Sequence, residues 1–165
     1  MLPSVRLRFG SGLVLVALAA SSIACAPVTT TRVRAQHAAR LPSQLAVLPF
    51  VDRTSEHDAE DLRALRVGFA EELRSSGRFE IVVTPESREH ADAPALVQVS
   101  ITQIDLGARR VAAVAEVSRP DGTPILKLSS HGDMVSVAWP LDYIGAATTL
   151  TQATLDDIAS ELAKR

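Results

Sequence analysis

Few residues of this sequence are arranged for chemistry. The chain has 165 residues, one cysteine and four histidines. No histidine lies three or four positions from another, as a helical metal site would need, and a single cysteine excludes both an internal disulfide and a cysteine-based zinc cluster. No nucleophile elbow, zinc-protease, P-loop or dinucleotide-binding motif occurs. The sequence therefore predicts no catalytic residue, no cofactor and no metal site, and we expect the protein not to be an enzyme.

One polar segment could still bind a cation weakly. It contains Glu86, Glu89, His90 and Asp92 within a few positions. Clusters of this kind are most simply a solvated acidic loop, which is the interpretation that we adopt.

The single cysteine, Cys25, follows a short apolar run. Arg6 and Arg8 make a positive leader, and every residue of 13–20 is apolar. A helix that crosses a bilayer needs about 20 predominantly apolar residues, and this run is shorter and ends in small residues. The pattern is typical of a secretory signal peptide, which we predict over residues 1–24.

The end of this segment, Ser22-Ile23-Ala24-Cys25, resembles the lipobox of bacterial lipoproteins. In that family the cysteine sulfur receives a diacylglyceryl group, the preceding peptide is cleaved and the new amine is acylated. The resemblance implies that Cys25 is the lipid attachment site. Ala26 is not the aspartate that retains such lipoproteins in the inner membrane, so it also implies anchoring in the outer membrane with the domain facing the periplasm. The alternative is an ordinary cleaved signal peptide in which Cys25 is incidental.

Residues 25–44 are predicted to be the lipidated cysteine and a flexible tether, because they are rich in Thr and Ala and have no apolar period. Charge divides the chain at the same place. All 19 acidic residues lie after residue 44, whereas the tether contains arginines, Arg40 among them, and no acid. An acidic domain behind a basic leader does not fit a nucleic-acid-binding protein, which needs a cationic surface.

Residues 45–165 are predicted to form one α/β (α+β) domain in the periplasm. Apolar and alternating runs predict strands at residues 45–48, 79–83, 96–106, 111–117 and 125–130, and apolar stripes predict long helices over residues 62–73 and 144–162. The predicted order is β-α-β-β-β-β-α, a mixed four- to five-stranded sheet with both helices on one face. Charged residues of the first helix, Arg66 among them, are expected to face solvent. Ser55 and Asp58 loosely resemble a capping box, and Gly77 is placed to end that helix.

The only tryptophan and the only tyrosine, Trp139 and Tyr143, lie just before the last predicted helix. Large amphipathic rings often anchor protein interfaces, and they also close the ends of hydrophobic cores. Both interpretations stay open: a plug of the core, or a patch that contacts a partner.

Three stretches of the domain, LAVLPF, LRVGFAEELRSSGRFEIV and VSRPDGTPILKLSS, resemble a group of periplasmic α/β modules. The group includes the amino-terminal domain of the Tol-system propeller protein, the curli secretion lipoprotein and the lipoprotein activator of penicillin-binding proteins. The resemblance implies a noncatalytic module that binds another envelope protein, and the acidic charge favours a basic partner surface. The chain has no room for the long hairpins with which the curli protein builds a channel.

We therefore expect an outer-membrane lipoprotein that acts as an assembly, scaffold or activator module. An accessory lipoprotein of an envelope transport system, which would bind lipid or small hydrophobic cargo in an apolar cavity, is the alternative. A hydrolase with a site that one sequence does not reveal is a third hypothesis.

Overall fold

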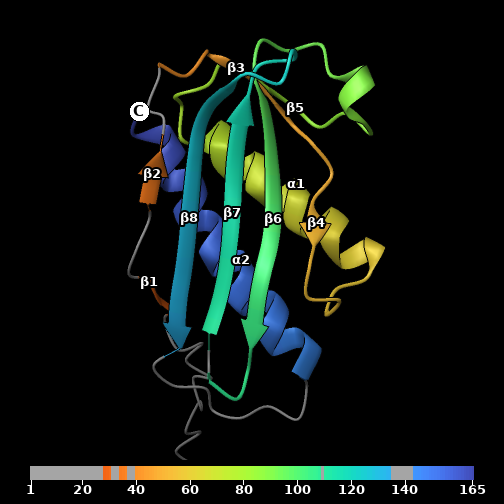
Figure 1. Ribbon diagram of the computed structural model, residues 1–165, viewed down its shortest axis with the longest axis vertical. Helices are drawn as coiled ribbons and strands as arrows, with labels where there is room; N and C mark the ends of the chain where they lie inside the picture. Colours follow the sequence, from red (N-terminus) through yellow and green to blue (C-terminus); the bar gives the residue numbers. More distant parts are fainter. Residues whose placement is uncertain (1–27, 31–33, 37–39, 109, 135–142) are drawn as a thin grey trace, which may run out of the picture.

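A twisted sheet with both long helices on one face forms the protein (Figure 1). The structure is a computed structural model that describes residues 28–30, 34–36, 40–108, 110–134 and 143–165. Three long antiparallel strands make the centre: β6 (Leu96–Asp105), β7 (Arg110–Ser118) and β8 (Pro124–Met134). Their residues alternate between the helix-covered face and the open face, as predicted, because successive side chains of a strand point to opposite sides.

A parallel part of the sheet adjoins β6. β3 (Gln44–Val47) lies between β5 (Ile81–Val83) and β6 and is parallel to both. The short β4 (Val51–Asp52) continues along β6 after Pro49, which has no backbone N–H to donate to a ladder. The strand order is β1-β8-β7-β6-β3-β5, so β5 is an outer strand.

The helices α1 (Ala59–Ser75) and α2 (Tyr143–Ala163) contact each other and cover the same face of the sheet. The stripe on α1 is buried at Leu65, Phe69 and Leu73, and Phe69 meets the ring of Phe50 edge to face with 5.6 Å between ring centroids. α2 buries Leu155, Ile158 and Leu162 in the same core. Of the helices that the structure describes, none has the length and apolarity needed to cross a membrane.

The predicted fold is confirmed: all five expected strands and both helices occur in the expected order. The sheet is larger than predicted, however, because three short strands join it. Two of them, β1 (Val28–Thr30) and β2 (Arg34–Gln36), lie in the segment predicted to be a flexible tether and pair antiparallel with β8. β8 would otherwise present an unpaired edge, which proteins generally cover, and the Val-Thr-Thr run of β1 has high β propensity.

The local signals around α1 are partly confirmed. Gly77 has the left-handed φ of 67° that suits the residue after a helix. The predicted capping box at Ser55 is wrong: the cap is Asp58, whose carboxylate accepts hydrogen bonds from the N–H groups of Glu60 and Asp61 at 2.8 and 2.9 Å. Ser55 instead adopts a φ of 64° in the loop before the helix.

Candidate interaction surfaces

The residues singled out from the sequence are only partly within the structure. Cys25 and Trp139 lie outside the described residues. Tyr143 is the first residue of α2, and its side chain is outside the description. Whether the side chains of Trp139 and Tyr143 form one patch therefore stays a prediction.

A groove of about 410 Å³ opens where three distant segments meet, and we call it the arginine groove. Arg40 precedes β3, Arg78 follows the left-handed Gly77 at the end of α1, and Arg165 follows α2. Leu41, Phe79 and Leu162 contribute the apolar part of its lining. Sequence analysis missed this site, because no local pattern links residues 40, 78 and 165.

The charge of the arginine groove is largely uncompensated. Arg165 lies 3.9 Å from Glu161, whereas Arg40 and Arg78 have no ion pair among the described residues. On the rim, Glu80 accepts a hydrogen bond from the Ser43 hydroxyl at 3.2 Å. Guanidinium groups bind carboxylates and phosphates through paired N–H donors, so the groove suits an anionic group with some apolar surface.

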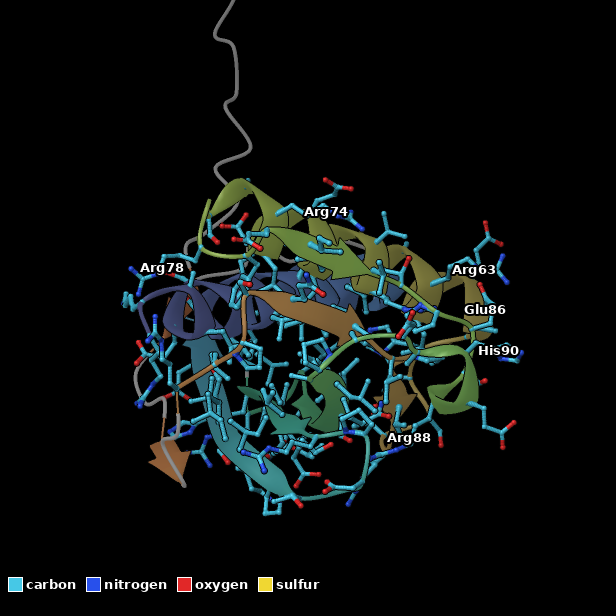
Figure 2. The ribbon with its side chains drawn as sticks, turned by 90° about the horizontal axis from the view of Figure 1, so that it is seen from above. Arg63, Arg74, Arg78, Glu86, Arg88 and His90 are labelled. Carbon is cyan, nitrogen blue, oxygen red and sulfur yellow. The ribbon has the colours of Figure 1, made fainter. Side chains whose placement is uncertain are left out.

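The opposite side of the molecule carries the acidic loop, residues 86–92, with exposed Glu86, Glu89 and Asp92. Figure 2 shows Glu86 and His90 on one side and Arg78 on the other. Arg88 fixes the loop, because its Nη2 donates to the carbonyls of Arg119 and Pro120 at 3.1 and 3.3 Å. Within the described residues, no group of three or more His, Cys, Asp or Glu is placed to hold a metal ion.

Arg66 attaches the acidic loop to the core, and the prediction that this arginine faces solvent is wrong. Only 6% of Arg66 is exposed. Its Nε donates to the Val47 carbonyl at 3.1 Å and its Nη2 donates to the Pro85 carbonyl, just before the loop. Burial lowers the pKa of Arg66, and the charge of Glu86 opposes that shift. The long stem lets a charged residue pack beside the apolar stripe while its head reaches backbone oxygens.

Asp52 and His57 form a buried pair in the loop before α1. The Asp52 carboxylate accepts hydrogen bonds from the Thr54 N–H and hydroxyl, from the N–H groups of Glu56 and His57, and from His57 Nδ1 at 3.1 Å. Burial alone would raise the pKa of Asp52, but the hydrogen bonds from Thr54 and His57 outweigh it and lower the pKa to about 2. His57 Nε2 is buried and has no hydrogen-bond partner in the described part of the chain.

Large apolar side chains are also exposed near the outer strand. On β5, Ile81 is 47% and Val83 is 36% exposed, and on α1 Val67 is 51% exposed. Arg74 of α1 donates to the Val82 carbonyl from Nε and Nη2 at 3.1 and 2.9 Å, so a charged side chain lies against this strand. A charge beside an outer strand disfavours uncontrolled pairing with other chains.

Comparisons with known proteins identify similar structures and no similar sequence. No family model and no curated protein matches the chain. A PelC dodecamer from Paraburkholderia phytofirmans is similar in structure with a TM-score of 0.60 and 16% identity, covering 81% of this chain and 98% of that chain. A single-substitution variant of the same dodecamer gives a TM-score of 0.57 and 17% identity, covering 82% and 99% of the two chains. At this identity the likeness shows a shared fold.

Proposed function

We propose that this chain is a noncatalytic lipoprotein module of the bacterial cell envelope that assembles with further copies of itself. One observation carries the self-assembly: the fold matches 98% of a chain whose structure is a dodecamer, with a TM-score of 0.60. Because the match spans nearly the whole of that chain, the segments that form its subunit contacts have counterparts in this fold. In this proposal, the partner protein that the sequence led us to expect is another copy of this chain.

The anchor is Cys25, acylated in the inner leaflet of the outer membrane. Only residues 26 and 27 separate it from β1, whose Val28 pairs with Met134 at the end of β8. At roughly 3.3–3.6 Å per residue, that spacer reaches about 10 Å. The end of the sheet where β8 finishes, lowest in Figure 1, would therefore lie close to the bilayer, and the end that carries the arginine groove would point into the periplasm.

The Asp52–His57 pair by itself gives no argument for hydrolase chemistry. An acid on Nδ1 of a histidine occurs in serine hydrolases, but there the other ring nitrogen bonds a nucleophilic hydroxyl. His57 Nε2 has no such partner among the described residues. The alternative role in carrying hydrophobic cargo has less support, because both the arginine groove and a smaller groove of about 200 Å³ beside Arg63, Arg66 and Glu86 have charged linings.

Two measurements on the full chain test this proposal. Growth with a labelled fatty acid should label the protein, and Cys25→Ala should abolish the label and release the protein from the membrane fraction. Native mass spectrometry of the protein extracted in non-ionic detergent should give a multiple of the subunit mass. A wild-type chain that carries no acyl group would overturn the anchor, and one that stays monomeric at all accessible concentrations would overturn the self-assembly.

A further inference from the structure

We infer that neighbouring copies join head to tail, with the acidic loop of one copy in the arginine groove of the next. The inference rests on the proposed self-assembly and names the surfaces that would perform it. A contact between two different patches repeats around a closed ring, or along a filament if the rotation does not close. An assembly of many copies needs this kind of interface or a combination of two-fold ones.

The two patches lie on opposite sides of the subunit. β3 and β5 are parallel, and Figure 2 shows them running from the side of Arg78 to the side of Glu86. Two of the three segments that line the arginine groove, 40–43 and 78–79, precede these strands, whereas the acidic loop follows β5. The strands thus span the subunit between the two patches, as a head-to-tail contact requires.

The charges of the two patches are complementary, and two of the three arginines and two of the three carboxylates have no ion pair within the described part of the subunit. Arg40 and Arg78 have no ion pair among the described residues, and neither have Glu89 and Asp92. Guanidinium and carboxylate groups form directed, paired hydrogen bonds when they meet. A two-fold contact of groove with groove would instead bring like charges together, which is unfavourable.

The acidic loop is held in place before any partner arrives. Arg66 donates to the Pro85 carbonyl at its start, and Arg88 donates to two carbonyls of the turn between β7 and β8. Ser87 Oγ and His90 Nδ1 lie 2.7 Å apart within the loop. A segment that is already ordered loses less conformational entropy on binding than a mobile one.

Complementary charge reversals test the contact. One variant carries Arg40→Glu and Arg78→Glu, and the other carries Glu89→Arg and Asp92→Arg, leaving Glu86 beside Arg66. Each variant alone should be monomeric at concentrations where the wild type assembles, and an equal mixture should regain the assembled mass, because each groove then faces a loop of opposite charge. Arg53→Glu, at an exposed position in the loop before α1 that belongs to neither patch, is the matched control and should assemble like the wild type.

The readouts are native mass spectrometry in non-ionic detergent for mass and far-UV circular dichroism for folding. If a reversed variant does not fold, Arg40→Gln with Arg78→Gln replaces it and should raise the concentration needed for assembly at least several-fold. A wild type that assembles while both reversed variants assemble equally well would overturn this inference and leave self-assembly standing. Failure of the mixture to assemble would also overturn it. A monomeric wild type would instead overturn the proposed function itself.

Discussion

Asp52→Asn tests whether the hydrogen bonds to one buried carboxylate hold the loop before α1. The Asp52 side chain is 4% exposed, and its two oxygens accept five hydrogen bonds. These bonds lower its pKa from 3.8 to about 2. Each pKa unit corresponds to about 1.4 kcal/mol, so the ionised form contributes about 2 kcal/mol to folding. An asparagine amide keeps one acceptor oxygen, and its NH₂ group would face the N–H groups that now donate to the second carboxylate oxygen. Asp52→Asn should therefore lower the free energy of unfolding at pH 7 by about that amount.

The assay is urea unfolding of the full chain in non-ionic detergent, followed by far-UV circular dichroism. Glu72→Gln is the matched control, since Glu72 is exposed, belongs to neither patch, and its carboxylate has no hydrogen bond among the described residues; it should change stability by less than about 0.5 kcal/mol. If Asp52→Asn unfolds at the same urea concentration as the wild type, the reasoning about this loop is refuted.

The lowered pKa of Asp52 predicts that the protein loses stability as the pH falls. The folded-state pKa of Asp52 lies below the unfolded value of 3.8, at about 2. The contribution of Asp52 is therefore complete above about pH 4 and is lost as the pH falls from about 4 to about 2, where the folded form also takes up its proton. The wild type should lose stability more steeply than Asp52→Asn in this window. Parallel pH profiles of the two proteins would contradict the assigned pKa.

Three further substitutions, with Ser55→Ala as a fourth for comparison, test local features by the same unfolding assay. Arg66→Met should lower stability by about 2–3 kcal/mol, because the buried Val47 carbonyl and the partly buried Pro85 carbonyl lose a charged donor; an unchanged midpoint would refute the buried placement. Gly77→Ala should cost about 1–2 kcal/mol through its φ of 67° alone, since a Cβ there meets no atom within 4 Å. Asp58→Ala should lower the free energy of unfolding by about 1 kcal/mol because it removes the helix cap, whereas Ser55→Ala should have little effect. A larger loss for Ser55→Ala than for Asp58→Ala would show that Ser55 is the cap after all.

Local patterns in the sequence were sufficient to predict both helices and the five main strands. Alternation in residues 96–101 and the stripe of Leu65, Phe69 and Leu73 predicted elements that the structure contains, because burial on one face of a strand or helix imposes a period on the sequence. The position of Gly77 predicted the end of α1 for a similar reason, since few other residues adopt its backbone conformation.

The remaining features depend on contacts between distant segments, which no local pattern encodes. Arg66 has the sequence context of a solvated helix residue, and only the carbonyls of Val47 and Pro85 explain its burial. β1 and β2 form because β8 offers an edge, and the arginine groove exists because residues 40, 78 and 165 meet. Acylation of Cys25 stays a prediction from the lipobox resemblance.

The pairing of β1 with β8 changes what the anchor can do. A free tether of about 18 residues would reach on the order of 60 Å when stretched and would let the domain search for partners at many heights and angles. With Val28 paired to Met134, a subunit acylated at Cys25, as proposed, would keep one end at the bilayer. Copies held at one height and in one orientation would meet side to side, and the arginine groove and the acidic loop lie on opposite sides of the subunit. Confinement by the proposed short anchor would thus raise the effective concentration of the two patches of the proposed head-to-tail contact, so that individually weak surface ion pairs would suffice for assembly in the membrane plane.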